Sequence, residues 1–205
     1  MSVKSREICY SGYAVRYSGV TRTPLYSAEH LTTERLQHAK QVKRQNRFHP
    51  DENIPADERA ELRHYVNSGY DRGHMAPAAD MPDEQASYES FSLANMVPQA
   101  PGNNRGVWAK LEALVRKLAE EQGQLYVITG PIFDETPRRV GGAVSVPVKL
   151  FKAVLIPATD TVRVFLVDNR DSAELQEVDL QMFEAVNGVR LFPGGKTAPD
   201  AKMQP

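Results

Sequence analysis

A long amphipathic segment at residues 104–122 constrains the fold more than any other part of the chain. Six apolar residues recur there at helical spacing and Gly123 follows them as a stop signal. These six are Val107, Trp108, Leu111, Leu114, Val115 and Leu118. A helix with one continuous apolar face needs another layer to cover that face. The segment therefore predicts a helix that packs against a sheet or against other helices.

Short apolar segments on both sides of this helix predict the sheet. β-branched and aromatic residues gather in runs of strand length between turn signals such as Gly130-Pro131 and Gly141-Gly142. The predicted strands are 8–17, 21–26, 91–97, 125–129, 144–148, 151–156 and 162–167, and further helices are predicted at 33–42, 56–66 and 180–187. This order predicts an α+β fold with a mixed or antiparallel sheet flanked by helices.

Length and composition indicate one globular domain over residues 1–205. The hydrophobic fraction is 41 % and the charged fraction 25 %, both near globular averages. No apolar run reaches the roughly 20 residues that span a bilayer, so no membrane class is predicted. The single Cys9 excludes an intramolecular disulfide, and we expect it to be a small buried residue on the first strand.

Charge is distributed unevenly along the chain. The net charge of −1 argues against a protein whose whole surface coats DNA. Residues 35–50 nevertheless hold five cations and no acid: Arg35, Lys40, Lys43, Arg44 and Arg47. Such a run usually forms a solvent-exposed face of the protein. The alternative interpretation is that these cations line the rim of a cleft and face the phosphates of a ligand.

The run Asp71-Arg72-Gly73-His74 holds the best candidate for a general base. The ordinary pKa of histidine lies near 6.5, so His74 can accept a proton from water at neutral pH. Gly73 permits unusual backbone angles or the close approach of another group. The guanidinium of Arg72 suits the charge of a five-coordinate phosphorus, as does that of Arg47, although either can equally be a structural ion-pair residue. Asp71 is expected to orient Arg72 or the backbone of the run.

Asn104 and Glu112 are candidates for a metal site on the long helix. The phase of the helix turns Asn104 toward the apolar stripe, where its amide oxygen suits a hard ion such as Mg²⁺. The alternative is an N-cap of the helix. Glu112 lies two turns on, about 80° round the helix, where it can hold a metal-bound water. Its alternative is an i,i+4 ion pair with Arg116. Asp80 is expected to have a supporting role.

Extended blocks of sequence around these residues resemble one known family. The first is Gly69-Tyr70-Asp71-Arg72-Gly73-His74-Met75-Ala76-Pro77, and the second runs from Leu93 through Gln99 and Asn104 to Glu112. With weaker blocks they cover residues from about 9 to 193. The chain is similar in these blocks to the DNA/RNA non-specific endonucleases, which carry a ββα-metal (His-Me finger) site.

The resemblance implies a role for each candidate residue. His74 would be the general base, Asn104 the one direct protein ligand of a hydrated Mg²⁺, and Glu112 a partner through water. Mn²⁺ or another divalent ion stays open. The remaining site residues would be Arg72, Arg47 and Arg116 at the phosphate, Asn95 shaping the site, and Asp71, Gly73 and Asp80 as support. Asn103 precedes Asn104, so a shift of the ligand by one residue also stays open. The substrates would be DNA and RNA, cut to 5′-phosphate and 3′-hydroxyl ends.

Two other functions compete with an endonuclease. One is a nucleic-acid-binding module of the same fold without turnover, and the other is a phosphodiesterase for small nucleotides. The resemblance favours a periplasmic or secreted protein whose leader is absent from this chain, and a cytoplasmic location stays open. A homodimer and an inhibitor protein are partners that the sequence neither predicts nor excludes.

Overall fold

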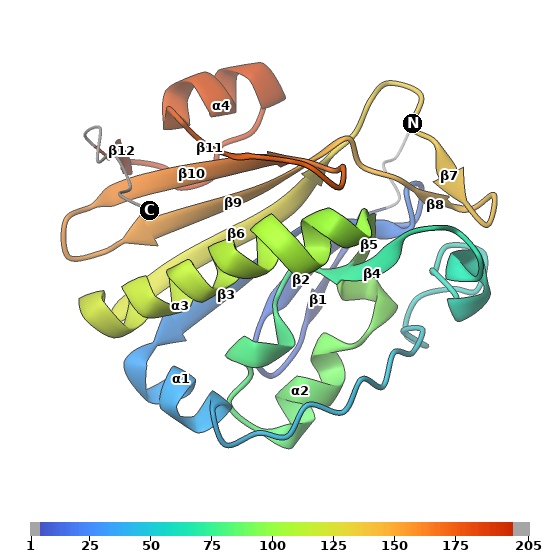
Figure 1. Ribbon diagram of the computed structural model, residues 1–205, viewed down its shortest axis with the longest axis horizontal. Coiled ribbons are helices and arrows are strands. Elements are labelled where there is room, and N and C mark those ends of the chain that lie inside the picture. Colours follow the sequence, from blue (N-terminus) through green and yellow to red (C-terminus); the bar gives the residue numbers. More distant parts are fainter. Residues whose placement is uncertain (1–4, 199–205) are drawn as a thin grey trace.

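The centre of the molecule is a twisted, largely antiparallel sheet, seen in the computed structural model of Figure 1, which describes residues 5–198. Its strands lie in the order β1-β2-β3-β6-β9-β10-β11, and β12 pairs with β10 in parallel. The bounds are β1 Ser5–Cys9, β2 Ala14–Ser18, β3 Thr23–Thr32, β6 Gln124–Ile132, β9 Lys149–Ile156, β10 Thr161–Asp168, β11 Leu175–Val178 and β12 Lys196–Thr197. The predicted α+β class with a mixed or antiparallel sheet is confirmed.

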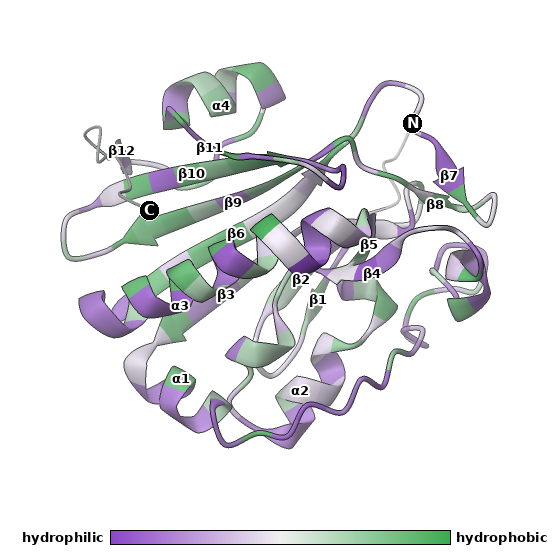
Figure 2. Cartoon of the chain, viewed as in Figure 1, coloured by the Kyte–Doolittle hydropathy of each residue, from purple (hydrophilic) through white to green (hydrophobic). Residues whose placement is uncertain are grey.

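Helices cover both faces of this sheet. Helix α3 (Ala109–Gln122) packs its apolar stripe on one face, against residues such as Leu150 and Val154 of β9. Helix α4 (Leu180–Asn187) packs on the other face, against their neighbours Phe151 and Ala153. Side chains alternate between the faces of a strand, so β9 serves both layers. Figure 2 accordingly shows β9 and β10 as predominantly hydrophobic, whereas α3 is hydrophobic on only part of its surface.

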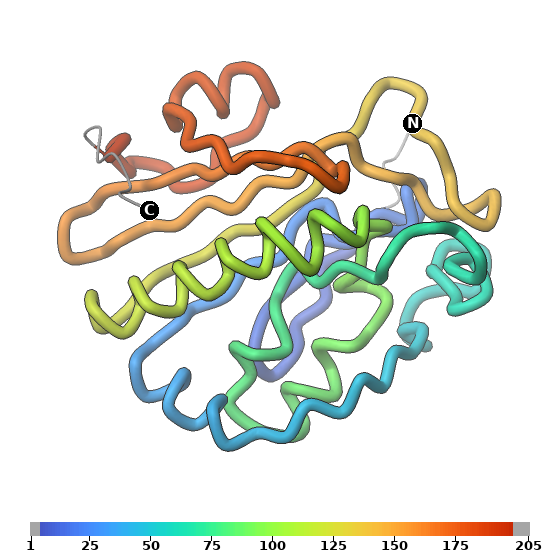
Figure 3. Tube along the Cα trace, viewed as in Figure 1, coloured from blue at the N-terminus to red at the C-terminus, as the bar shows by residue number. Residues whose placement is uncertain are grey.

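A second, smaller unit lies beside the start of α3. Strands β4 (Asp71–His74) and β5 (Met96–Gln99) form an antiparallel pair in which Gly73 faces Val97. The chain leaves β5 and enters a π-helical turn, Asn103–Trp108, that continues into α3. Figure 3 shows the two strands side by side at the N-terminal end of α3. This arrangement of two strands and a helix is the ββα unit of the fold.

Short elements connect these parts. They are α1 Thr33–Ala39, α2 Glu84–Ser90, the 3-10 turns Leu62–Tyr65, Ala78–Asp80 and Leu93–Asn95, and the small strands β7 Arg139–Val140 and β8 Val144–Ser145. Within residues 5–198, no helix is long and apolar enough to cross a bilayer.

Two predicted elements at the N-terminal side are wrong. Residues 8–17 form parts of two strands, because the Tyr10 amide bonds the Tyr13 carbonyl and closes a turn. Only Leu62–Tyr65 is helical within the predicted helix 56–66, as a 3-10 turn. The Tyr17 hydroxyl donates to the Glu58 carbonyl and accepts from the Ala60 amide, so a distant side chain uses backbone groups that a helix would pair internally.

Three further predictions need correction. The predicted strand 91–97 contains a 3-10 turn, and the strand itself is Met96–Gln99, which passes through Pro98. In the predicted strand 144–148, only Val144–Ser145 is extended and paired. Cys9 is exposed, because β1 is an edge strand of the sheet and its last residue points outward.

Candidate active site

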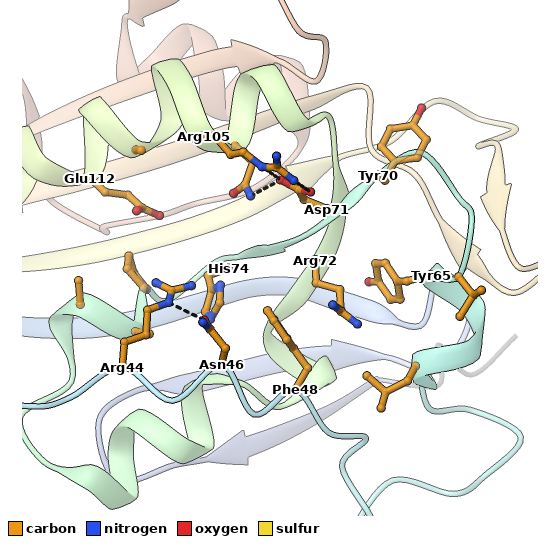
Figure 4. A pocket seen from close by; sticks show the side chains of 17 residues that line it. Arg44, Asn46, Phe48, Tyr65, Tyr70, Asp71, Arg72, His74, Arg105 and Glu112 are labelled. Atoms are coloured by element: carbon orange, nitrogen blue, oxygen red, sulfur yellow. Dashed lines mark hydrogen bonds and ion pairs between the residues drawn. The ribbon is translucent and has the colours of Figure 1, made fainter.

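A cavity of about 590 Å³ opens between the ββα unit and residues 44–48 and 62–70 (Figure 4). Five of the residues predicted for the site line it: Asp71, Arg72, His74, Asn104 and Glu112. The other polar and aromatic residues of its wall are Arg44, Asn46, Phe48, Tyr65, Tyr70 and Arg105. The tertiary structure therefore brings the two predicted halves of the site together, although about 30 residues of chain separate His74 from Asn104.

His74 ends β4 in a largely apolar position. Its ring packs edge-on to Phe91, with 4.9 Å between the ring centroids, and 5.7 Å from Phe48. The side chain is buried, and its Nε2 has no hydrogen-bond partner among the described residues. Burial and, to a smaller extent, the positive charge of Arg44 together lower the pKa of His74 to about 3. The imidazole is therefore neutral at physiological pH, the state in which it can accept a proton.

Gly73 is needed for close approach. A Cβ atom at this position would lie 1.9 Å from Oε1 of Gln99, which is far inside van der Waals contact. Gln99 faces Asp71 across the strand pair, and its Nε2 donates to Oδ1 of Asn103 at 2.7 Å. The glycine thus allows β4 to lie against the side chain that supports the start of the helix.

Asn104 presents one side of its amide to the cavity. Its Nδ2 donates to Oδ2 of Asp71 at 2.9 Å. The Oδ1 atom has no hydrogen bond within residues 5–198 and remains available to a ligand. The side chain does not cap the helix, since the turn begins at Asn103 and the Asn104 amide bonds the Ala100 carbonyl. The alternative of an N-cap is therefore wrong.

Asp71 has partners that the sequence did not predict. It accepts two hydrogen bonds from Arg105, at 2.8 and 2.6 Å, besides the one from Asn104. Burial would raise the pKa of Asp71, but the hydrogen bonds from Arg105 and Asn104 outweigh it, and the pKa is lowered. The expectation that Asp71 orients Arg72 or the backbone needs correction: the carboxylate orients the Asn104 amide.

Asn103 has a structural position. It is fully buried, accepts from Gln99 and donates through Nδ2 to the Asp168 carbonyl at 2.5 Å. The one-residue ambiguity is thereby decided in favour of Asn104 as the residue that faces the cavity.

Glu112 and Arg116 separate in the structure. Glu112 is half-buried in the cavity wall, where burial raises the pKa of its carboxyl to about 7 against the opposing charge of Lys152. Arg116 lies outside this cavity and donates to Oδ1 of the buried Asp80 at 2.9 Å. The alternative of a Glu112–Arg116 ion pair is wrong, because Arg116 pairs with Asp80. Burial raises the pKa of Asp80, and the charge of Arg116 opposes that rise.

Arg72 is the predicted arginine that faces the cavity most directly. Its guanidinium carbon lies 4.2 Å from the centroid of the Phe48 ring. No hydrogen bond or ion pair engages it within the described part of the chain, so its N–H donors remain available to an anion. Arg47 is exposed and does not line the cavity, whereas Arg44 does and donates to Oδ1 of Asn46 at 2.7 Å. Arg44 was not among the predicted site residues, although it belongs to the cationic run 35–50, for which the rim of a cleft was the alternative interpretation.

Asn95 is buried next to the segment that follows His74 and does not line the cavity. Its Nδ2 donates to the carbonyls of Ala76 and Ser90, at 2.8 and 3.0 Å, and its Oδ1 accepts from the Ala76 amide at 2.9 Å. These bonds hold the segment that follows His74, as a buried supporting residue would.

A charged cluster that the sequence did not predict lies beneath Glu112. Lys152 of β9 is 1 % exposed, and its Nζ donates to Oγ1 of Thr129 at 2.6 Å. Burial raises the pKa of Glu29 on β3, and the cations of the cluster oppose this. The cluster consists of Glu29, Arg35, Asp80, Glu112, Arg116 and Lys152. The alternation of side chains along β3 and β9 does not by itself predict that Glu29 and Lys152 are buried.

The donor set suits a hard, hydrated cation. The cavity offers the free amide oxygen of Asn104 and the carboxyl of Glu112, and residues 5–198 contain no group of three or more His, Cys, Asp or Glu side chains arranged for a metal. Mg²⁺ keeps several waters and takes few protein ligands, whereas structural zinc needs a full set of nitrogen or sulfur ligands. Asn104 and Glu112 therefore fit an ion of the Mg²⁺ type.

Comparison with known proteins agrees with this geometry. The profile of the family described as DNA/RNA non-specific endonuclease matches residues 1–198. The mitochondrial nuclease EXOG of Danio rerio is 34 % identical over 206 residues, which cover 90 % of this chain and 60 % of that protein. The mitochondrial nuclease 1 of Schizosaccharomyces pombe is 36 % identical over 183 residues, covering 80 % of this chain and 57 % of that protein. The chain thus spans less than two thirds of the length of both relatives.

A solved structure supports the fold independently. A chain in the crystal structure of the EndoG/EndoGI complex, which concerns the mechanism of EndoG inhibition, superposes with a TM-score of 0.83 at 28 % identity. The match covers 90 % of this chain and 84 % of that chain. The sequence profile extends over the ββα unit and all residues that line the cavity. This chain belongs to the DNA/RNA non-specific endonuclease family.

Proposed function

We propose that the chain is a metal-dependent endonuclease that hydrolyses phosphodiester bonds of DNA and RNA without sequence specificity. One observation carries the proposal: a buried, neutral His74 and the free Oδ1 of Asn104 line the same cavity as the uncommitted guanidinium of Arg72. A base, a metal ligand and a phosphate-binding cation are the parts that hydrolysis of a phosphodiester requires.

The residues divide the work as follows. His74 accepts the proton of the attacking water, since its lowered pKa keeps the imidazole neutral. Arg72 and Arg44 bind the non-bridging oxygens of the phosphate from the cavity wall. Asp71 holds the Asn104 amide so that its oxygen faces the cavity. The expected products are a 5′-phosphate and a 3′-hydroxyl.

Asn104 would hold a divalent cation directly and Glu112 would hold one of its waters. The family is metal-dependent, and we propose Mg²⁺, with Mn²⁺ or another divalent ion as an alternative. The chemistry that such an ion supplies when bound is positive charge beside the phosphate and the departing oxygen.

Arg47 and Arg116 have indirect roles in this proposal. The exposed Arg47 is available to phosphates farther along a substrate, and Arg116 keeps the buried carboxylate of Asp80 neutralised beneath Glu112. Asn95 and Gly73 support the backbone on either side of His74.

The substrate classes follow from the composition of the cavity. A site built from arginines and a metal recognises the phosphate backbone, which carries no base sequence. This supports nucleic acid of either sugar as the substrate. The free amide oxygen of Asn104, which lines the same cavity as His74, supports an enzyme over a binding module without turnover. Cleavage of long DNA in preference to a dinucleotide would exclude the small-nucleotide phosphodiesterase.

Digestion of supercoiled plasmid and of RNA with added Mg²⁺ tests the proposal. We expect His74→Ala to abolish both activities without changing the circular dichroism spectrum, and EDTA to abolish them until Mg²⁺ is restored. His30→Ala, at an exposed histidine on β3, is the matched control and should retain full activity. Full activity of His74→Ala or in EDTA would refute the mechanism.

Domain organisation, location and protein partners are proposals of the same kind. We propose residues 1–205 as one nuclease domain, since one sheet draws its strands from β1 to β12. A periplasmic or secreted location stays the preferred prediction, with a cytoplasmic one as the alternative, while several named relatives are mitochondrial nucleases. A homodimer and an inhibitor protein stay open, and an inhibitor is suggested by the complex in which EndoG is bound to EndoGI.

A further inference from the structure

The active-site cavity has two chemically different ends. Asn104 and Glu112 lie toward α3, whereas apolar and aromatic residues line the other end: Leu62, Tyr65, Val66 and Tyr70. Figure 4 shows Tyr65 and Tyr70 on the far side of Arg72 from His74. Leu62 is 39 % exposed and Val66 is 67 % exposed. Single exposed apolar residues are ordinary, but here two of them line the wall of a cavity that also holds five charged side chains.

Arg72 marks the boundary between the two ends. Its guanidinium lies over the ring of Phe48, and its N–H donors have no acceptor among the described residues. A phosphate bound by Arg72 would carry one neighbouring nucleotide toward His74 and the other toward Tyr65. The apolar end of the cavity is therefore adjacent to the place where a nucleoside would lie.

Tyr65 supplies a second, independent observation. It is 6 % exposed, and its hydroxyl has no hydrogen-bond partner within residues 5–198. In Figure 4 this hydroxyl points toward Arg72. Folded proteins seldom leave a buried hydroxyl unsatisfied, and such a group often marks a place that a ligand completes.

The segment that carries these residues is fixed relative to the catalytic strand. Tyr65 packs in one apolar cluster with Met96 of β5. Asn67 and Gly69, with φ of 53° and 79°, adopt left-handed conformations that turn the chain directly into β4. The apolar wall and His74 thus belong to one short stretch of chain that packs on β5.

We propose that Leu62, Tyr65, Val66 and Tyr70 form a nucleobase subsite for the nucleotide next to the scissile phosphate. The inference rests on the proposed nuclease function and names how that site holds its substrate. The face of a base is apolar and would lie on the exposed side chains of Leu62 and Val66, while the Tyr65 hydroxyl meets a polar edge of the nucleoside. Every base has such a face, so this contact is compatible with cleavage at any sequence.

Single-stranded oligonucleotides with one stable abasic analogue test the subsite. For the wild-type chain, we expect the missing base to reduce cleavage of the adjacent bond, on one side only, on the order of tenfold. The double variant Leu62→Ser/Val66→Ser should cleave abasic and intact positions at similar rates. Val20→Ser, at a residue that is 52 % exposed and lies outside the cavity, is the matched control and should discriminate as the wild type does.

Tyr65→Phe provides a second variant whose folding is not in question, because it removes only the hydroxyl without a partner. We expect an increased KM for oligonucleotides with an unchanged thermal midpoint. If the wild-type chain cleaves abasic and intact positions at equal rates throughout, the subsite proposal is overturned, whereas the proposed nuclease function is not. Retained discrimination in the double variant, or an unchanged KM in Tyr65→Phe, would overturn the subsite proposal as well. A wild-type chain that cuts no oligonucleotide would contradict the proposed function itself.

Discussion

At the scale of single residues, burial decides the chemistry of His74. Sequence patterns identify the histidine, but its ordinary pKa near 6.5 would leave it partly protonated below neutral pH. The apolar contacts with Phe48 and Phe91 and the nearby Arg44 lower its pKa to about 3. The fold therefore keeps the imidazole of His74 neutral over a wide pH range.

The depressed pKa of His74 predicts a loss of stability in acid. The neutral form is favoured in the folded protein, so its contribution is fully present above pH 6.5 and is lost as the pH falls toward 3. Between pH 7 and pH 5 the wild-type chain should lose about 2 kcal/mol of unfolding free energy through this residue. Urea unfolding of wild type and His74→Ala at both pH values measures it. Equal pH dependence of the two proteins would contradict the prediction.

At the scale of elements, the π-helical turn between β5 and α3 separates two neighbouring asparagines. Asn103 is buried between Gln99 and the Asp168 carbonyl, while Asn104 faces Asp71 and the cavity. A π-helical turn changes the phase of the side chains relative to an α-helix and is frequent at functional sites. The turn therefore buries one asparagine in the structure and turns the next toward the cavity, where we propose that it binds a metal ion.

Replacing each asparagine by alanine should give opposite results. Asn103→Ala leaves buried partners unsatisfied and should lower the unfolding free energy by about 1–3 kcal/mol. Asn104→Ala removes one half-buried hydrogen bond, so it should change stability by less than about 1 kcal/mol while abolishing cleavage. Urea unfolding and plasmid digestion of both variants make the comparison. An active Asn104→Ala enzyme would show that the ligand is misassigned.

At the scale of the whole molecule, a cluster of charged side chains lies next to the candidate active site, between the central sheet and α3. Lys152 comes from the middle of the sheet, Glu29 from another strand, and Arg116 and Glu112 from α3. Three carboxyl groups and three cations meet there: Glu29, Asp80 and Glu112 beside Arg35, Arg116 and Lys152. Buried charges persist only when they are compensated, so the cluster couples the sheet to α3.

Lys152→Met should therefore be strongly destabilising. It leaves buried carboxylates uncompensated, and we expect a loss of about 3–5 kcal/mol near neutral pH. The loss should be smaller at pH 5 than at pH 8, because the carboxyls of the variant have raised pKa values and are protonated in acid. Urea unfolding at both pH values measures this effect. Partial recovery in Lys152→Met/Glu29→Gln serves as the control, and a variant as stable as wild type would exclude the coupling.

Local patterns in the chain were enough to predict the α+β class, the helix 104–122 and the residues of the DRGH run, because helical periodicity, turn signals and a contiguous motif are local properties. They also predicted His74, Asn104 and Glu112, which line one cavity. Only the tertiary structure revealed four other features. These are the partners of Asp71, the presence of Arg44 instead of Arg47 at the cavity, the burial of Lys152 and the Tyr65 hydroxyl without a hydrogen-bond partner among the described residues. Those features depend on contacts between residues distant in the chain, and burial, which sets their charge and pKa, exists only after the layers have packed.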